Sequence, residues 1–365
     1  MKKRHLSVLF SACLALCLTL TSIIPVQATE VHTASWPSGP SINAQGAIVM
    51  ELSTGTILYE KNATDAMYPA SITKVMTALL AVENCSMDEI VTFSNTAVYG
   101  NGSNSSSIGM KPGESITMEH CMYGLMLASA NEVAKAIGEH VAGDLESFAN
   151  MMNERAAQLG CVNTHFANAN GLHDDNHYTC AYDMALIARE AIKDPTFKKI
   201  SGTRVFVIPP TSMTEDDRWV ANTHQMVNPA QLPQYRYDDC YAGKTGFTNE
   251  ARYTLVTYAK RGALDIVCVT MHSQMLADQY NDAITLMDYV FENFSVHPIS
   301  QLGQTPTFDN LSLFTRFSPL FDVENAPLSI DNNSYVVLPN GASYSGVEQT
   351  ITYHEVDSLD KGLTN

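Results

Sequence analysis

The order of strand-like and helix-like segments along the chain constrains its fold more than any other feature. Two short runs rich in Ile, Val, Leu and Tyr, at 47–52 and 56–60, flank a Ser-Thr-Gly turn, which is typical of a hairpin. From about 69 to 192 the apolar residues follow a mostly helical period, and strand patterns return at 251–258 and 264–271. The sequence therefore predicts one sheet built from both ends of a domain, with helices over its faces.

The predicted helices have recognisable starts and ends. The first one begins after Pro69, and Thr117 is suited to cap a helix that runs to about Leu127. Apolar residues from Ile284 to Phe294 share one face of a last helix, which Pro298 is predicted to end. Three further helices are predicted at 132–141, 145–159 and 182–192.

The two ends of the chain differ from its middle. A basic start at 2–4, an apolar run at 6–24 and the small residue Ala28 predict a signal peptide over 1–28, and hence export to the cell envelope or beyond. An uncleaved membrane anchor is the alternative, since the run is near the lower length that crosses a bilayer. The polar segment 29–45 predicts a flexible mature N-terminus.

The organisation that follows is a main domain over 46–297 and a C-terminal module over 298–365. Strand-like stretches at 335–338 and 347–354 with intervening turn residues indicate that this module is a small β structure. Its role, and whether it is truncated at Asn365, are left open.

Composition excludes several classes of protein. With 45% hydrophobic and 16% charged residues, the chain is too apolar to be disordered. Its net charge of −17 repels phosphate backbones, so nucleic acid is excluded as a partner. The six cysteines beyond the signal peptide form no C-x-x-C pair, which disfavours zinc-ribbon and thioredoxin folds. We expect them to be buried as small apolar side chains, and their disulfide state stays open. They are Cys85, Cys121, Cys161, Cys180, Cys240 and Cys268.

A serine and a lysine share one face at the start of the first predicted helix. Ser71 and Lys74 are three residues apart, so the amine can lie beside the hydroxyl and act as its base if burial or a neighbouring cation keeps it neutral. Unpaired N–H groups at the helix start favour a developing oxyanion. Taken alone, the pair has a simpler interpretation, in which Ser71 is an ordinary helix cap and Lys74 is a solvated lysine.

Two more short motifs follow in the chain. Ser129-Ala130-Asn131 lies in the break between two helices, where Asn131 is suited to be an N-cap. Lys244-Thr245-Gly246 opens a predicted strand, where a lysine beside a hydroxyl suits a carboxylate, although a lysine can also simply protect a strand edge. The order S-x-x-K, serine-x-asparagine, K-T-G is that of penicillin-binding proteins and class A β-lactamases.

With these motifs, the sequence resembles the serine-type D-alanyl-D-alanine carboxypeptidases, the low-molecular-mass penicillin-binding proteins. The resemblance covers most of 40–296, and less firmly the module after 300. It implies an α+β fold: a β-lactamase/transpeptidase-like domain with an antiparallel sheet flanked by helices and a helical subdomain, followed by the small all-β module. Further matching residues are Tyr68-Pro69-Ala70, Gly113-Glu114, Asn170-Gly171-Leu172, Tyr182-Asp183, and Phe247-Thr248 with Ala251.

The resemblance also implies a role for each motif residue. Ser71 would attack the penultimate D-alanine carbonyl of a peptidoglycan stem peptide, Lys74 would take its proton, and Ser129 would relay a proton to the leaving D-alanine. Substrate would be bound by Asn131, by Lys244 and Thr245 at the terminal carboxylate, and by the strand at Gly246 and Phe247. The N–H groups of Ser71 and Phe247 would form the oxyanion hole, β-lactam antibiotics would acylate Ser71, and neither a cofactor nor a metal is required.

Some positions depart from the family pattern. Asn222-Thr223-His224 stands where relatives often have Asn-Thr-Asn, which puts substrate preference in question. Cys180 stands where relatives often carry a helix-capping threonine, and Thr179 just before it is a candidate for that role. Many relatives bind the membrane through a basic amphipathic helix at the C-terminus, and the sequence shows no such pattern there. Either the protein is freely secreted or the chain is truncated, so membrane association is left open.

Three alternatives compete with this interpretation. A metal site among His173, Asp174, Asp175, His177 and Cys180 is disfavoured, because the segment resembles a family loop. A β-lactamase is disfavoured because no Glu-x-x-Leu-Asn loop lies between the second and third motifs. A non-catalytic wall-binding or penicillin-sensing protein is disfavoured because the serine and lysine are both intact.

Overall fold

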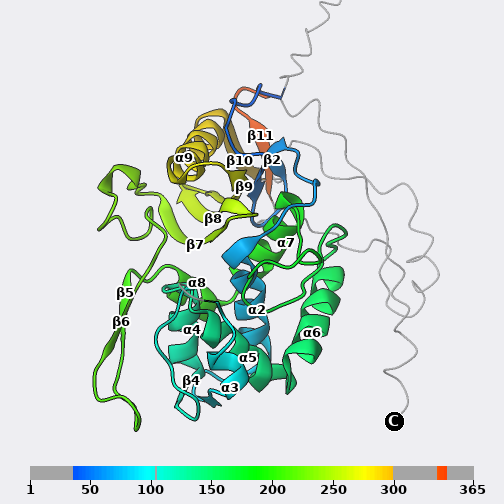
Figure 1. The fold of residues 1–365 in the computed structure, drawn as a ribbon. Helices are drawn as coiled ribbons and strands as arrows, with labels where there is room; N and C mark the ends of the chain where they lie inside the picture. Colours follow the sequence, from blue (N-terminus) through cyan, green and yellow to red (C-terminus); the bar gives the residue numbers. More distant parts are fainter. Residues whose placement is uncertain (1–35, 103–104, 299–334, 343–365) are drawn as a thin grey trace, which may run out of the picture. The chain divides into compact units, whose positions relative to one another are not determined.

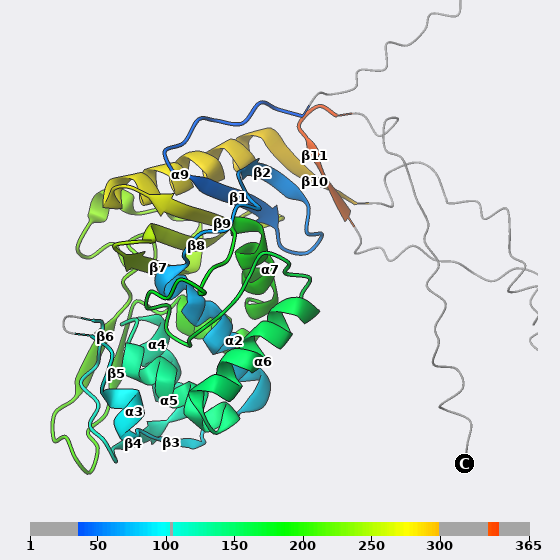
Figure 2. The same cartoon turned by 45° about the vertical axis from the view of Figure 1, so that its right-hand side comes forward.

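A five-stranded antiparallel sheet is the centre of the fold. The computed structural model describes residues 36–102, 105–298 and 335–342. The sheet has the order β2-β1-β9-β8-β7, and the pairing of β1 with β9 joins the early hairpin to the late strands, as predicted. Figure 1 labels β2, β9, β8 and β7, and Figure 2 labels β1 as well. The strands are β1 (Gly46–Glu51), β2 (Ile57–Lys61), β7 (Cys240–Thr248), β8 (Arg252–Arg261) and β9 (Leu264–Ser273).

Strand β1 shows why the sheet is covered on both faces. All six of its residues are buried, and alternate side chains enter two different apolar cores. Ile48 and Met50 pack in the core beneath the helices, whereas Ala47 and Val49 pack in the core under the last helix. Because neighbouring side chains of a strand point to opposite faces, each face needs its own layer of helices.

The helices form those two layers. The long helix α9 (Leu276–Asn293) lies along one face of the sheet, and the remaining helices lie on the other side (Figure 2). Helix α2 is central to this second group, with contacts to α4, α5, α6, α7 and α8. The group comprises η1 (Ala70–Thr73), α2 (Lys74–Asn84), α3 (Asn95–Val98), α4 (Met118–Met126), α5 (Asn131–Ala142), α6 (Leu145–Gln158), α7 (Ala181–Ala191) and α8 (Pro195–Ser201).

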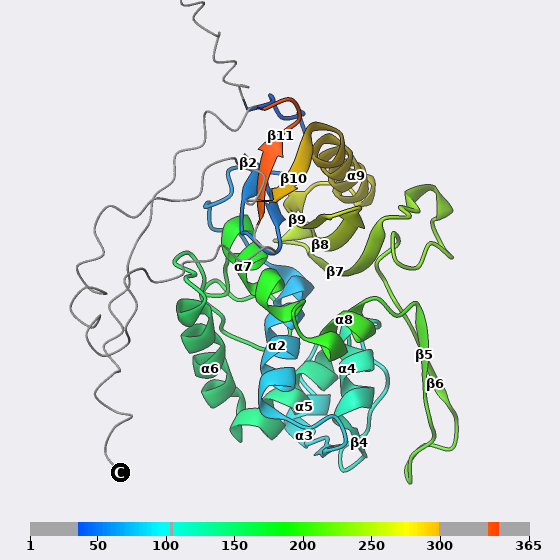
Figure 3. The ribbon, with the colours of Figure 1, turned by 180° about the vertical axis from the view of Figure 1, so that it is seen from behind.

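Two small hairpins and a short turn complete the main unit. Strands β3 (Ile90–Thr92) and β4 (Ser115–Thr117) pair beside the helices. Strands β5 (Val205–Ile208) and β6 (Arg218–Ala221) form an arm that extends beyond them (Figure 3), and η2 spans Pro233–Tyr235. In the described ranges no helix is both long and apolar enough to cross a membrane.

The helix caps bear out one expectation and correct two. Thr117 caps α4, with its hydroxyl accepting from the N–H of His120. Helix α5 has Ala130 at its N-cap, so Asn131 is the first helical residue and is not the cap. Helix α7 is capped by Cys180 itself, whose sulfur accepts from the N–H of Asp183 at 3.4 Å, so the candidate Thr179 is not the cap.

The last helix ends earlier than predicted. It stops at Asn293, five residues before Pro298, because the chain becomes extended at Phe294 and continues as β10 (Phe294–Pro298). Strand β10 pairs with β11 (Tyr335–Pro339), which is the strand expected at 335–338. Val337 of β11 is buried against the core under α9, so β10 and β11 belong to the same compact unit as the sheet.

Several expectations fall outside the described residues. They are the signal peptide over 1–28, the N-terminal segment up to 35 and the strand at 347–354. The division of the chain at 297/298 therefore remains a prediction. The six cysteines beyond the predicted signal are all described, and they are free thiols, four of them buried.

Candidate active site

The first motif lies at a distorted turn that leads into α2. Ala70 has a φ of +51°, which is unusual for a residue with a side chain, and Ser71 follows it within the 3₁₀ turn η1. Lys74 begins α2 one turn later. Thr254 of β8 anchors this turn to the sheet, since its hydroxyl donates to the Pro69 carbonyl at 2.7 Å. The sheet therefore fixes where the serine stands.

Lys74 is completely buried, and its amino group contacts three oxygens. Nζ lies 3.0 Å from Ser71 Oγ, 2.8 Å from Asn131 Oδ1 and 2.6 Å from the Asn170 carbonyl oxygen. Burial holds the pKa of Lys74 well below its usual range, and the nearby Lys244 lowers it further while Glu132 opposes the shift. A neutral amine has two N–H donors, which the two carbonyl oxygens accept. Its lone pair is then left for the Ser71 hydroxyl.

The second and third motifs meet through a hydrogen bond. Ser129 has a φ of +59° in the break between α4 and α5, and its Oγ accepts from Lys244 Nζ at 3.0 Å. Lys244 also donates to the Thr245 carbonyl at 2.8 Å. Burial lowers the pKa of Lys244 to about 7. The amine is therefore poised between its charged and neutral forms near neutral pH.

A cavity of about 480 Å³ opens above these residues. The two lysines lie beneath its wall, because Lys74 and Lys244 are buried and neither lines the cavity. Thr245 faces the cavity, and its hydroxyl lies 2.8 Å from that of Thr223. The other six predicted site residues all line the cavity: Ser71, Ser129, Asn131, Thr245, Gly246 and Phe247.

Gly246 sets how closely β7 approaches the serine. A Cβ at this position would lie 2.9 Å from the Ser71 nitrogen and 2.3 Å from Thr254 Oγ1. Only glycine leaves room for the strand edge and the start of η1 to come together. Phe247 next to it is 48% exposed and packs against the ring of Tyr253, so the strand edge is open to the cavity at this point.

The loop at 168–172 supplies site features to which sequence reasoning assigned no role. Asn168 Oδ1 accepts from the N–H groups of Asn170 and Gly171, which aims the Asn170 carbonyl at Lys74. Gly171 has a φ of +81°, and a Cβ there would lie 1.9 Å from the Ala70 carbonyl oxygen. The sequence signal that could have revealed this loop is Asn170-Gly171-Leu172, which matches the family pattern but was given no role.

Glu132 is a second residue that the motifs did not single out. Its carboxylate is buried next to Asn131 and accepts from the Ser107 hydroxyl at 2.6 Å and the Ile108 N–H at 2.7 Å. The N–H of Asn131 donates to the Ser106 carbonyl at 2.8 Å. These bonds hold one wall of the cavity against the start of α5.

Three residues of the disfavoured metal cluster have partners outside it, and His173 Nε2 also lies 3.4 Å from Asp175 Oδ1 within it. His177 Nε2 lies 2.8 Å from Thr73 Oγ1, behind the serine turn, and Nδ1 accepts from the Ala167 N–H. Burial lowers the pKa of His177 to about 4, so its ring is neutral. Cys180 caps α7, and His173 packs edge-on against Tyr68.

Of the three residues at 222–224, where the chain departs from the family pattern, two face the cavity and one does not. Asn222 and Thr223 line the cavity, and Asn222 Nδ2 donates to the Ser201 and Thr203 carbonyls. His224 points away behind β7, where it is fully buried with Nε2 2.9 Å from Thr257 Oγ1. Burial lowers its pKa to about 3, so the substituted position adds no charge beneath the site.

Comparison with known proteins identifies relatives of this chain. The sequence pattern of the peptidase S11 D-alanyl-D-alanine carboxypeptidases matches residues 31–275. The chain is 32% identical to D-alanyl-D-alanine carboxypeptidase DacF of Bacillus subtilis over 72% of its length, and that match spans 66% of the relative. It is 32% identical to D-alanyl-D-alanine carboxypeptidase DacB2 of Mycobacterium tuberculosis, over 73% of this chain and 87% of the relative.

The fold has solved counterparts as well. The crystal structure of the Streptomyces K15 DD-transpeptidase superposes with a TM-score of 0.64 at 29% identity, over 70% of this chain and all of that one. The Mycobacterium tuberculosis D-alanyl-D-alanine carboxypeptidase gives the same TM-score, with 72% of this chain covered. The α+β transpeptidase-like fold expected from the sequence is thereby confirmed. The chain belongs to the family of serine-type D-alanyl-D-alanine carboxypeptidases.

Proposed function

We propose that this protein removes the terminal D-alanine from peptidoglycan stem peptides that end in D-Ala-D-Ala, through an acyl-enzyme on Ser71. The observation that carries the proposal is the buried Lys74 amine, 3.0 Å from Ser71 Oγ, with carbonyl oxygens at its two other contacts. Such an amine is a base already aimed at the hydroxyl proton.

In the acylation step, Ser71 Oγ forms a bond to the carbonyl carbon of the penultimate D-alanine, and its proton passes to Lys74. The C–N bond to the terminal D-alanine then breaks, and the leaving amine takes a proton through Ser129. The N–H groups of Ser71 and Phe247 are the donors we assign to the oxyanion, which the close approach of β7 at Gly246 supports. Water then hydrolyses the ester and frees Ser71.

Recognition of the substrate is assigned to the two walls of the cavity. Thr245 and Thr223 offer hydroxyls to the terminal carboxylate, with the charge of Lys244 directly beneath them. On the other wall, Asn131 uses Oδ1 for Lys74, which leaves its amide N–H groups for a substrate carbonyl. A β-lactam fits the same scheme, because opening its ring leaves both parts of the molecule attached to Ser71.

The site of action is proposed to be outside the cytoplasmic membrane. The support is the signal peptide predicted over 1–28, together with the placement of the peptide substrate in the cell wall. N-terminal sequencing of protein collected from the envelope or medium tests this point. A first residue close to position 29 is expected, and a retained N-terminus would favour the anchored alternative.

The experiment that tests the function is release of D-alanine from a soluble peptide ending in D-Ala-D-Ala. Wild-type protein is expected to release one D-alanine per peptide, and the same peptide ending in L-Ala-L-Ala is expected to be left intact. Ser71→Ala should abolish release, whereas Ser147→Ala, which alters an exposed serine in the first turn of α6, should leave it unchanged. Rapid turnover of penicillin without D-alanine release would instead support a β-lactamase.

A further inference from the structure

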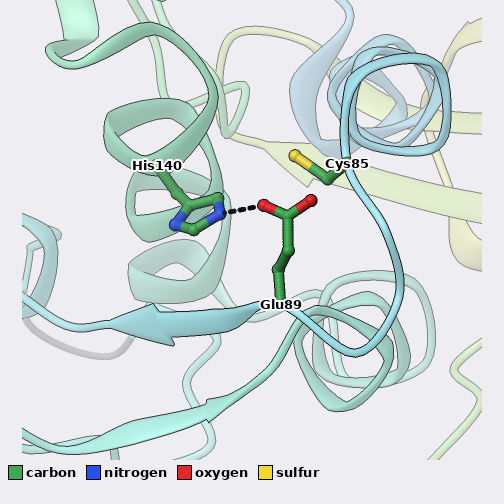
Figure 4. A group of neighbouring side chains, drawn as sticks. All are labelled: Cys85, Glu89 and His140. Atoms are coloured by element: carbon green, nitrogen blue, oxygen red, sulfur yellow. Dashed lines mark hydrogen bonds and ion pairs between the residues drawn. The ribbon is translucent and has the colours of Figure 1, made fainter.

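A cysteine, a glutamate and a histidine meet at the end of the helical layer that lies away from the catalytic motifs. Cys85 is the C-cap of α2, Glu89 precedes β3, and His140 is in the last turn of α5. The glutamate carboxylate lies between the thiol and the imidazole (Figure 4). The sulfur, carboxylate oxygen and ring nitrogen that they offer all lie within 4.8 Å of one another.

The chemistry of this group suits a transition-metal ion. Thiolate, imidazole and carboxylate are the three ligand types that Zn²⁺ takes in proteins, at bond lengths of about 2.0–2.3 Å. A tetrahedral ion with such bonds holds its ligand atoms roughly 3.5 Å apart. His140 Nε2 and Glu89 Oε2 are 2.8 Å apart and no pair of the three ligand atoms is more than 4.8 Å apart, so side-chain shifts of about 1 Å bring them to that spacing.

The surroundings of the group also favour a cation. Two helices, α2 and α5, end at the group, and helix C-terminal ends carry partial negative charge. The Ser86 N–H donates to Glu89 Oε1 at 2.6 Å, which orients the carboxylate and leaves Oε2 toward the histidine. The side chains of Glu89 and His140 are 42% and 25% exposed, so an ion has a path from solvent and a place for a water ligand.

We propose that Cys85, Glu89 and His140 bind one Zn²⁺, with water as the fourth ligand. The thiol proton of Cys85 is released to solvent when the ion binds. The bound ion then links the end of α2 to the end of α5 and to the loop before β3. The starts of the same two helices hold Lys74 and Asn131, which contact each other at 2.8 Å. The site is therefore a structural clamp, because the 11 residues of α2 separate it from the chemistry by about 16 Å.

Metal binding by the reduced, full-length mature protein tests the proposal. After removal of metal with a chelator, Zn²⁺ is expected to bind at one ion per chain. At a free concentration of about 100 times Kd, it should raise the unfolding midpoint by roughly 5 °C. Co²⁺ as a substitute should give the thiolate-to-cobalt absorption band that only a cysteine ligand produces. Affinity should rise with pH as the thiol loses its proton more easily.

Two variants and one measurement on the wild-type protein decide between the outcomes. Cys85→Ser should lose the cobalt band and the thermal shift, while Cys240→Ser, at the other partly exposed cysteine, should keep both. In the wild type, Zn²⁺ should protect Cys85 from alkylation as located by mass spectrometry, which needs no variant to fold. Zn²⁺ binding that persists in Cys85→Ser, or a wild type with neither band nor protection, would overturn the proposal.

Discussion

Thr73 Oγ1 lies 2.8 Å from His177 Nε2, and both side chains are buried behind the turn that carries Ser71. Since His177 Nδ1 accepts from the Ala167 N–H, the ring proton is on Nε2 and is donated to Thr73. The Thr73 hydroxyl in turn donates to the Ala70 carbonyl at 2.8 Å. A chain of hydrogen bonds thus holds the strained residue that precedes the nucleophile candidate.

The neutral state of His177 makes stability depend on pH. Its pKa is about 4 in the folded protein, against about 6.5 when unfolded, so only the unfolded chain takes up this proton between those pH values. Acidification from pH 6.5 to 4 therefore destabilises the fold by about 3 kcal/mol through this residue. His177→Gln, which keeps an N–H donor but does not titrate, should remove that contribution. Urea unfolding at a series of pH values measures it, and a stability difference from wild type that stays constant with pH would contradict the prediction.

Replacement of Gly171 is expected to disturb both folding and acylation. In Gly171→Ala, the new Cβ would meet the Ala70 carbonyl oxygen at 1.9 Å in a left-handed backbone conformation. A loss of at least about 2 kcal/mol of stability and a slower reaction with penicillin should follow. Gly143→Ala is the matched control, because its φ of +88° is similar but nothing lies within 4 Å. It should cost about 1 kcal/mol and leave acylation intact, and equal effects of the two variants would refute the role of the contact.

The pKa of Lys244 predicts an alkaline limb in the activity on peptide. If a protonated Lys244 attracts the terminal carboxylate, kcat/KM should fall above about pH 7, where its proton is lost. Lys244→Arg keeps a positive charge at all accessible pH values, so its alkaline limb should move upward even if its peak activity is lower. Lys260→Arg, at an exposed end of β8, should leave the profile unchanged. An alkaline limb that stays in place in Lys244→Arg would assign it to another group.

The strands and the pairing of Ser71 with Lys74 were predictable from local patterns, whereas the meeting of the three motifs was implied by the resemblance to a family. The short apolar runs at 47–52 and 264–271 are typical of strands buried on both faces, and S-x-x-K places Lys74 beside Ser71 on one helical turn. The Asn170 contact was not predictable in this way. It is made by a backbone carbonyl 96 residues along the chain from Lys74, and a carbonyl leaves no mark in side-chain composition.

The other errors have comparable physical causes. Phe294 fits the apolar face of a helix and also the start of a strand, so periodicity alone does not reveal that α9 ends before it. Cysteine is not among the common N-cap residues, and only the structure shows that the sulfur of Cys180 receives the Asp183 N–H. The partner of β11 was likewise hidden, since strand pairing across 299–334 depends on contacts distant in sequence.

Covalent labelling by penicillin is the most direct test of the claim that Ser71 is the nucleophile and Lys74 its base. Mass spectrometry of wild-type protein after brief exposure should find one adduct, on Ser71. Lys74→Ala should fold but acylate more slowly by orders of magnitude, because the hydroxyl then has no base within reach. Ser71→Ala should acquire no adduct at all. An adduct of unchanged yield in Ser71→Ala, or an unchanged acylation rate in Lys74→Ala, would contradict the account.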